Sequence, residues 1–370
     1  MRLGIKFSPP TKIKSGSAYT FATNLIPILY KQNPDLKIFT ASPQVFSELE
    51  GLFINYTENP FWQSSPTKKI ASWLYQQVTL EHQLIQEKVD TLYCPFNYES
   101  LLWTRKIPQV ITVHDLIPLM WQEDFKATST LWKYLYIPAI KNAKAIITES
   151  ENTKRDILKF CNISHEKIFV IPIGFTFKEI KSEDCSYKQE PYILYVCSTH
   201  YPYKNLPKLF TAYQAIHHNI PHKLVIVGKS IARFTPQIKA QISELGLSEK
   251  IVLRENLSDT ELAIIYKNAD LFVYPSLYEG FGIPPLEAMS YGVPVIASGV
   301  ASIPEVCGDA AFYIEPHSVE SIADGIVKGL TDSDLRQKLK IAGQERVKLF
   351  NWETSAEKIL EVCQIVSQST

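Results

Sequence analysis

The feature that most constrains the fold is an alternation of short apolar runs with helical patterns, which occurs twice along the chain. In the first half the strand-like runs are RLGIKF, LKIFTAS, TLYCPF, QVITVHD, AKAIITES and KIFVIPIG, separated by helical stretches such as 18–32 and 151–161. In the second half they are YILYVCS, HKLVIVG, KIVLREN, DLFVYPS and VPVIAS. Strands that alternate with helices form parallel sheets covered on both faces. The sequence therefore predicts an α/β protein with two doubly wound, Rossmann-like domains that face each other across a cleft.

The boundary between the halves is predicted by a polar segment without periodicity, FTFKEIKSEDCSYKQEPY. We expect an N-terminal domain over 1–174, a linker over 175–190 and a C-terminal domain over 191–350. The chain's 370 residues suit two domains. The last helical pattern, within 351–370, lies beyond the second alternation, and we expect it to pack back on the first domain.

The amino-acid composition limits the classes of binding partner and the cellular compartment that we expect for this protein. Lysine plus arginine equals aspartate plus glutamate at 38 each, so no excess of basic residues indicates nucleic-acid binding. The six cysteines lack C-x-x-C spacing, which is typical of free thiols in a reducing compartment. No apolar run approaches the roughly 18 residues of a spanning helix, and MRLGIKFS leads directly into a strand-like run rather than a signal peptide. We expect a cytoplasmic protein.

One segment of the basic N-terminal half could contact a membrane. The stretch SPTKKIASWLYQQVTL, residues 65–80, joins Lys68 and Lys69 to apolar residues in a short amphipathic pattern. This pattern favours peripheral association with the inner face of a membrane, but a core helix explains it at least as well.

Two glutamates eight positions apart mark the candidate site in the second half. The stretch YPSLYEGFGIPPLEAMSYG gives a strand end, a glycine loop and a helix whose first turn accepts Pro284 and Pro285 and which Gly292 ends. Glu279 is predicted in the loop and Glu287 in the first helical turn. Loop amides and the positive end of the helix dipole converge there. The alternative interpretation is a solvated loop charge and a carboxylate that complements the dipole.

Three other places at strand ends could contribute. Lys204 precedes a helix at a strand-to-helix crossing, where an ammonium can meet a phosphate. KSGSAY places Gly16 and Ser17 in a turn before the first helix, and TVHDLIP places His114 at a strand's carboxyl end. A solvated lysine and a structural histidine are the alternatives.

No pattern predicts a metal site. The D-x-D at Asp332 and Asp334 follows Thr331 at the start of a helix, so helix capping explains it. The histidines at 217, 218 and 222 lack a cysteine or carboxylate set for zinc. We expect a metal-free anion site that needs no cofactor.

These motifs resemble those of glycosyltransferase family 4, a retaining family with the GT-B fold. EGFGIPPLEAMSYGVPVIAS followed by SIPEVCGDAAFYIEP is similar to the family's E-x7-E block, and VHDLIPL, ITESENTKRDIL and ILYVCSTHYPYKNL extend the resemblance over nearly the whole chain. The variants PEVCGDAA and YKNL look more like the mannosyl and rhamnosyl branch. The resemblance implies a hexosyltransferase with a GDP- or UDP-sugar donor and a glycan or lipid-linked saccharide acceptor.

The resemblance also implies roles for individual residues. Glu287 would bind the nucleotide ribose and Glu279 the donor sugar, while Lys204 would hold the diphosphate. The loop Gly280, Phe281 and Gly282 would hold the sugar through its backbone, Gly16 and Ser17 would approach the diphosphate, and His114 would lie near the donor sugar and the acceptor.

The sequence departs from the family near Lys204, where the usual neighbouring arginine is absent and Cys197 stands in place of a glycine. Gly16 also stands where the family often has a glycine pair. Two other functions remain open at this point: a GT-B-fold sugar-nucleotide epimerase, and a non-catalytic subunit that binds a sugar nucleotide.

Overall fold

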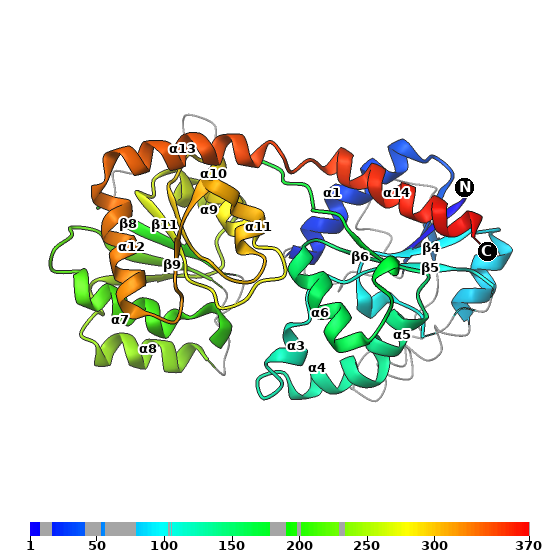
Figure 1. Ribbon diagram of the computed structural model, residues 1–370, viewed down its shortest axis with the longest axis horizontal. Helices are drawn as coiled ribbons and strands as arrows, with labels where there is room; N and C mark the ends of the chain where they lie inside the picture. Colours follow the sequence, from blue (N-terminus) through cyan, green and yellow to red (C-terminus); the bar gives the residue numbers. More distant parts are fainter. Residues whose placement is uncertain are drawn as a thin grey trace. The chain divides into compact units, whose positions relative to one another are not determined.

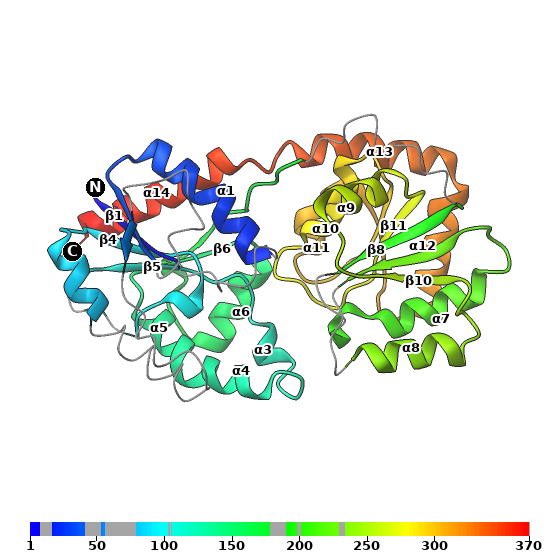
Figure 2. The ribbon, with the colours of Figure 1, turned by 180° about the vertical axis from the view of Figure 1, so that it is seen from behind.

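The computed structural model describes residues 1–7, 17–40, 53–55, 79–102, 104, 106–177, 190–197, 201–228 and 234–369, with the side chains of 17–19 and 53–55 outside the description. The chain divides into two compact units. Unit 1 comprises Met1–Gly174 with Asn351–Thr370, and unit 2 comprises Phe175–Phe350. Figures 1 and 2 show the elements of each unit.

Unit 1 contains a parallel sheet of seven strands in the order β3-β2-β1-β4-β5-β6-β7. The strands are β1 (Leu3–Lys6), β2 (Leu36–Thr40), β3 (Phe53–Asn55), β4 (Thr91–Cys94), β5 (Gln109–Thr112), β6 (Ala145–Thr148) and β7 (Ile168–Val170). In β1, β4, β5 and β6 every residue is buried, as expected for strands that are covered on both faces.

Helices lie on both sides of this sheet, with α1 and α14 on one side and α5 and α6 on the other (Figure 1). They are α1 (Ser17–Gln32), α3 (Ile117–Met120), α4 (Lys126–Leu131), α5 (Ile137–Asn142), α6 (Glu151–Cys161) and α14 (Trp352–Gln368), with the short turns η3 (Asn97–Glu99), η4 (Trp132–Tyr136) and η5 (His165–Lys167). The C-terminal helix α14 contacts α1 and strands β4, β5 and β6. The Ser355 hydroxyl donates a hydrogen bond to the carbonyl of Pro172.

Unit 2 contains a parallel sheet of six strands in the order β10-β9-β8-β11-β12-β13. The strands are β8 (Tyr192–Val196), β9 (Lys223–Val227), β10 (Ile251–Arg254), β11 (Leu271–Tyr274), β12 (Val295–Ser298) and β13 (Ala311–Ile314). The strand order reverses between β8 and β11, which are paired neighbours. Doubly wound sheets bind ligands outside the carboxyl ends of the strands at such a switch point.

The helices of unit 2 are α7 (Leu206–Ile216), α8 (Thr235–Glu244), α9 (Asp259–Lys267), α10 (Ile283–Ser290), α11 (Ile303–Cys307), α12 (Val319–Thr331) and α13 (Ser333–Val347), with η7 (Pro202–Lys204) and η8 (Gly308–Ala310). Helices α7 and α12 contact each other, and α9, α10 and α13 lie on the opposite side of the sheet (Figure 2). Gly325 lets α12 approach the sheet, because a Cβ there would lie 2.5 Å from the Cγ2 of Ile314.

The predicted class, two Rossmann-like doubly wound sheets, is confirmed. Each run that we named as a strand contains one, and the helix predicted over 151–161 has those bounds. The buried residues of α7 include Leu206, Leu209, Phe210, Tyr213 and Ile216, which lie on one face of the helix. We did not predict β3 and β13, which are three and four residues long and lie at sheet edges.

Candidate functional site

Glycine and proline shape the loop between β11 and α10. The loop ends at Gly282, the N-cap of α10, which has φ 103°. This left-handed conformation favours glycine, because a side chain would strain it. Proline occupies the start of the helix, where a missing N–H loses no hydrogen bond. The buried Ser302 hydroxyl lies 2.8 Å from the carbonyl oxygen of Glu279 and 3.0 Å from that of Phe281, so it fixes the loop backbone.

Lys204 and Glu279 form a buried ion pair at the switch point of unit 2. The Nζ of Lys204 lies 2.7 Å from Oε1 and 2.9 Å from Oε2 of Glu279. The two side chains are only 5% and 9% exposed. Lys204 ends η7 after β8, and Glu279 lies in the loop after β11, so the pairing of these strands brings together two predicted site residues that are 75 positions apart.

Backbone contacts hold the segment that carries Lys204. Asn205 has φ 60°. Its side-chain amide donates to the carbonyls of Pro275, at 2.9 Å, and Pro316, at 2.7 Å. The hydroxyl of Tyr195 donates to the carbonyl of Lys204 at 3.0 Å. The lysine is therefore placed by β8, by the β11 loop and by the segment after β13.

Tyr274, the last residue of β11, is buried beside Glu279. Burial raises the pKa of Tyr274 well above its usual value, and the charge of Glu279 and a hydrogen bond with its carboxylate raise the pKa further. The phenol therefore stays protonated and donates to the carboxylate. The Lys204 ammonium also lies 5.0 Å from the centre of the Tyr203 ring.

Glu287 lies in the second turn of α10, because the helix begins at Ile283 and its first turn contains no acidic residue. The prediction of the first turn was therefore wrong. The hydroxyl of the buried Tyr266 donates to Oε2 of Glu287 at 2.6 Å. Burial raises the pKa of Tyr266 well above its usual value and the charge of Glu287 raises it further, so the phenol remains a donor. The Tyr266 ring stacks on Tyr291 at 5.9 Å.

The other predicted donor residues are placed as follows. Gly280 and Phe281 are buried in the β11–α10 loop, and the ring of Phe281 packs edge-on against Phe350 at 5.6 Å. Gly16 lies outside the described residues. Ser17 begins α1, and its side chain lies outside the description.

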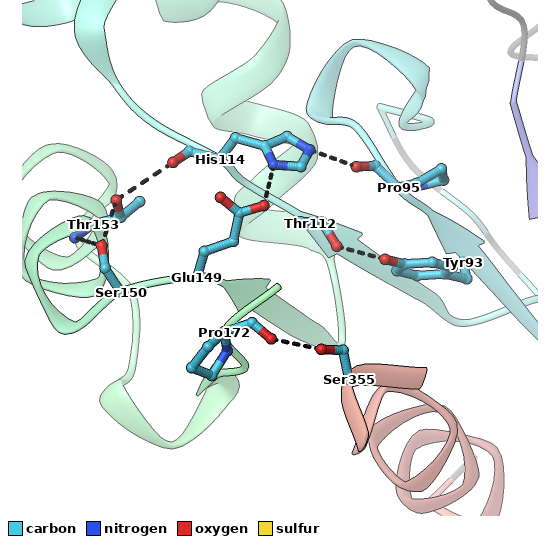
Figure 3. A network of polar contacts seen from close by, with 9 residues as sticks. All are labelled: Tyr93, Pro95, Thr112, His114, Glu149, Ser150, Thr153, Pro172 and Ser355. Atoms are coloured by element: carbon cyan, nitrogen blue, oxygen red, sulfur yellow. Dashed lines mark hydrogen bonds and ion pairs between the residues drawn. The ribbon is translucent and has the colours of Figure 1, made fainter. Parts of the chain in front are cut away.

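His114 follows β5 in unit 1, and both of its ring nitrogens face acceptors (Figure 3). Its Nδ1 lies 2.5 Å from Oε1 of Glu149, and its Nε2 lies 2.9 Å from the carbonyl oxygen of Pro95. Phe21 packs edge-on against the ring at 4.9 Å and Phe96 lies 4.8 Å from it. The sequence analysis did not identify Glu149, although a carboxylate directly after the apolar run AIIT was a usable signal.

A second buried lysine, also missed, lies at the switch point of unit 1. Lys6 ends β1, and Glu99 follows β4, the neighbouring strand at which the order reverses. The Lys6 Nζ donates to the carbonyl of Glu99 at 2.8 Å and lies 3.4 Å from its carboxylate Oε2. The side chains are 1% and 7% exposed.

Within the described ranges, no group of three or more histidine, cysteine, aspartate or glutamate side chains is arranged to hold a metal ion. The helix-capping interpretation of the D-x-D motif is confirmed, because Oδ1 of Asp332 accepts from the backbone N–H of Leu335 at 2.9 Å.

None of the helices in the described residues is long and apolar enough to cross a bilayer.

The site of unit 2 combines groups suited to a polar, anionic ligand. An ammonium that is already buried can meet phosphate oxygens without further desolvation. The carboxylate of Glu287 can accept hydrogen bonds from a vicinal diol. Backbone N–H groups at the start of α10 supply further donors. Together these groups match a phosphate, a diol and a polyhydroxylated moiety in one ligand.

Two family profiles match the chain. Residues 19–177 match a family profile described as Glycosyltransferase Family 4, and residues 177–346 match one described as Glycosyl transferases group 1. Together the two matches span 19–346.

Curated relatives are named as mannosyltransferases. O-antigen chain mannosyltransferase B of Escherichia coli is 30% identical over 62% of this chain and 62% of its own length. O-antigen chain mannosyltransferase RfbU of Salmonella typhimurium is 31% identical over 58% of each chain. Serotype-specific mannosyltransferase WbdA of E. coli is 27% identical over 68% of this chain and 33% of its own. The matches thus cover less than two thirds of these relatives.

Solved structures share the fold. Sucrose-phosphate synthase from Thermosynechococcus elongatus superimposes with a TM-score of 0.79 at 18% identity, over 100% of this chain and 99% of the other. Anabaena HepE, solved in complex with UDP and glucose, gives 0.74 at 18% identity, over 97% and 98%.

Proposed function

Because this chain belongs to glycosyltransferase family 4 and has the GT-B fold, we propose that it is a retaining glycosyltransferase. It moves a hexose from a nucleoside diphosphate sugar to a hydroxyl group of a glycan or lipid-linked saccharide, in polysaccharide or glycoconjugate synthesis. The observation that carries the proposal is the buried Lys204–Glu279 pair beside the glycine loop at the switch point of unit 2.

The donor is GDP-mannose or a UDP-hexose. The names of the curated relatives favour mannose, and the UDP complex of HepE, a protein of the same fold, favours UDP. Both donors present the same chemistry to the site: a ribose diol, a diphosphate and a hexose.

Each side chain of unit 2 then has one task. Glu287, oriented by Tyr266, accepts hydrogen bonds from the ribose diol. Lys204 contacts the diphosphate. Glu279 accepts from hydroxyls of the donor sugar and stabilises the positive charge that develops at its anomeric carbon. The amides of Phe281 and Gly282 hold the sugar.

The reaction is a substitution with retention on one face of the sugar. The bond from the anomeric carbon to the diphosphate oxygen breaks, its electron pair stays on the phosphate, and the acceptor oxygen forms the new bond on the same face. The acceptor proton passes to the departing phosphate. Lys204 and the loop amides meet the negative charge on that phosphate, which lowers the barrier because they are held in place beforehand.

Nucleotide binding gives the first test. Thermal unfolding of the protein is measured with GDP, UDP, ADP and CDP, because a ligand that binds the folded state raises the midpoint according to its affinity. We expect a clear rise with GDP or UDP. Equal and negligible shifts with all four would contradict the donor site.

The two glutamates can be separated by substitution. Glu287→Ala should weaken binding of the free nucleotide, because it removes contacts to a part of the donor that does not react. Glu279→Ala should lower turnover more than nucleotide affinity. Lys204→Ala should reduce turnover about a hundredfold, the scale of losing one preorganised contact. Nucleotide affinity lost in Glu279→Ala and kept in Glu287→Ala would reverse the assignment.

Incubation with donor separates this proposal from its alternatives. Product that forms only when a lipid-linked saccharide or glycan is added supports transfer. Isomerised sugar nucleotide formed without an acceptor would identify an epimerase. Donor binding without turnover across the whole acceptor panel would identify a non-catalytic subunit.

A lipid-linked acceptor would bring the protein to the inner face of a membrane from the cytoplasm. The amphipathic segment 65–80, which lies outside the described residues except for 79–80, remains the candidate contact. Flotation with anionic vesicles at low salt tests this location, and protein that stays at the bottom of the gradient would argue against it.

A further inference from the structure

The His114 imidazole in unit 1 is held between the carboxyl group of Glu149 and the backbone carbonyl of Pro95. Its Nδ1 faces the Glu149 carboxylate at 2.5 Å, and its Nε2 faces the Pro95 carbonyl at 2.9 Å (Figure 3). A neutral imidazole carries one N–H and could satisfy only one of these acceptors. When Glu149 is ionised, both contacts are hydrogen bonds only if both nitrogens carry a proton, which is the charged imidazolium; a protonated Glu149 would instead donate to Nδ1 of a neutral ring.

Strand β6 and helix α6 fix the surroundings of this ring. Glu149 follows β6 directly, is 6% exposed and precedes Ser150, whose hydroxyl caps α6 by accepting from the N–H of Thr153 at 3.1 Å. The Thr153 hydroxyl in turn lies 3.4 Å from the carbonyl oxygen of His114. The start of α6 is therefore connected both to the carboxylate and to the backbone of the histidine (Figure 3).

Aromatic packing limits the ring's rotation. Phe21 from α1 meets the His114 ring edge-on, at an interplanar angle of 86°, and Phe96 lies tilted at 34°. These side chains are apolar and buried. The hydrogen bonds and the two rings therefore hold the imidazole from several sides, although 23% of its side chain is exposed.

Charges around His114 favour the same protonation state. Burial lowers the pKa of His114, but the charge of Glu149 and the hydrogen bonds to Glu149 and Pro95 raise it by more, with Asp115 adding a smaller effect, so the pKa lies above its usual value. Glu149 and Asp115 are the carboxylates whose charges raise the pKa of His114. The Asp115 carboxylate is turned toward α3, where its Oδ1 accepts from the N–H of Ile117 at 2.9 Å.

We propose that Glu149 is a positioning residue that holds His114 as an imidazolium, so that His114 contributes a fixed positive charge and is not the base that deprotonates the acceptor. The second clause rests on the proposed glycosyl transfer. It agrees with a mechanism in which the leaving phosphate takes the acceptor proton, because a ring with both nitrogens protonated has no lone pair to offer.

Nitrogen NMR on the full-length chain tests the protonation state without any transfer assay. Protein labelled with 15N in its histidine rings is titrated, and the His114 signal is assigned by its loss in His114→Asn. In the wild type we expect the ring to lose its proton in a transition above the usual value of about 6.5, with both ring nitrogens protonated below that transition. A ring that titrates at or below that value would overturn the proposal, whatever the variants do.

Three variants assign the effect to Glu149. Glu149→Gln keeps the shape and removes the charge, so the His114 transition should fall to or below about 6.5. Glu149→Asp keeps the charge and should restore part of the elevation. Glu166→Gln removes an exposed carboxylate from η5 of the same unit and should change nothing. An unchanged His114 titration in Glu149→Gln would contradict the role of Glu149.

The pH profile of transfer tests the second clause. If the charged ring is the active form, the Glu149→Gln rate should fall as pH rises through the lowered pKa of His114, while the wild-type rate persists to higher pH. A wild-type rate that rises as His114 loses its proton would identify a general base and overturn the clause. If the protein transfers no sugar, the proposed function fails, and the NMR titration still decides the protonation state.

Discussion

The Lys204–Glu279 pair should stabilise unit 2 because it is buried, not because it is short. A matched pair in the same unit, Lys348 and Glu345, has its atoms 2.6 Å apart, against 2.7 Å for Lys204 and Glu279. The surface side chains are each 67% exposed, while those of the buried pair are 5% and 9% exposed. Removing one partner of a buried pair leaves an uncompensated charge and typically costs about 3–5 kcal/mol. Exposed pairs contribute about 0–1 kcal/mol.

These losses of unfolding free energy can be expressed as shifts of the urea concentration at the unfolding midpoint. With a slope of about 2 kcal/mol per M, Lys204→Met and Glu279→Gln should each lower the midpoint by about 1.5 to 2.5 M. The double variant leaves no charge behind, so its loss should be well below the sum of the single losses. Lys348→Met and Glu345→Gln should each lower the midpoint by less than about 0.5 M.

The chain offers a way to follow the two units separately. The six tryptophans lie at 62, 73, 103, 121, 132 and 352, all within the residue ranges of unit 1. Tryptophan fluorescence therefore reports the unfolding of unit 1, whereas far-UV circular dichroism reports both units. We expect the pair variants to shift a circular dichroism transition that the fluorescence does not follow. Single and double variants whose losses add, or buried and surface pairs with equal losses, would refute the reasoning.

Four further outcomes follow from the structure. Tyr266→Phe removes the hydroxyl that donates to Glu287, so calorimetry should show roughly tenfold weaker binding of GDP or UDP. The control Tyr313→Phe, whose hydroxyl donates to the carbonyl of Gly308, should bind the nucleotide normally. Equal affinities of the two variants would contradict the role of Tyr266. Gly282→Ala places a side chain at a residue with φ 103° and should lower the free energy of unfolding in urea by about 1–3 kcal/mol. The control Gly299→Ala should lower it less, because φ is not positive there and the nearest atom to the new Cβ lies at 3.7 Å. Equal losses in the two variants would contradict the strain argument. Because the folded-state pKa of His114 is raised, its contribution to the stability of unit 1 should be complete below about pH 6.5 and disappear as pH rises through the folded-state pKa. Unfolding detected by tryptophan fluorescence, in the wild type and in Glu149→Gln, measures this pH dependence. Parallel plots of stability against pH for the two proteins would contradict the contribution. Transfer should retain its rate in excess EDTA and in Asp332→Ala, and activity abolished by EDTA and restored by manganese would overturn the metal-free mechanism.

Much of the fold was predictable because buried parallel strands are short, continuous apolar runs and the loops between them contain glycine and proline. The start of α10 illustrates this, since Pro284 and Gly292 predict both ends of the helix from local chemistry. The strands β3 and β13 were missed although they are as long as β7 and β1, which were predicted. Both lie at a sheet edge, and their pairing with a single neighbour defines them as strands. Local propensity contains no information about such pairing.

The sequence predicted several residues of the candidate site but not the contacts between them. Glu279 and Lys204 each stand at a strand's carboxyl end, which sequence can indicate. That they neutralise each other depends on β8 lying beside β11, which is a property of the sheet order. Glu149 and Tyr266 were missed for the same reason, because each acts on a residue from another element.

The two units repeat one arrangement with different consequences. In both sheets the strand order reverses beside a buried lysine–glutamate pair, Lys6 with Glu99 and Lys204 with Glu279. Lys6 lies closer to the Glu99 carbonyl oxygen, at 2.8 Å, than to the carboxylate, at 3.4 Å, so the backbone itself holds this ammonium. Lys204 instead contacts both carboxylate oxygens of Glu279, at 2.7 and 2.9 Å. A phosphate oxygen can replace one of these oxygens as the acceptor from Lys204, and the loop amides then help to meet the negative charge that the phosphate brings. The same position in the fold therefore places the ammonium on a backbone carbonyl in unit 1 and on a carboxylate alone in unit 2, which favours unit 2 for the proposed donor site.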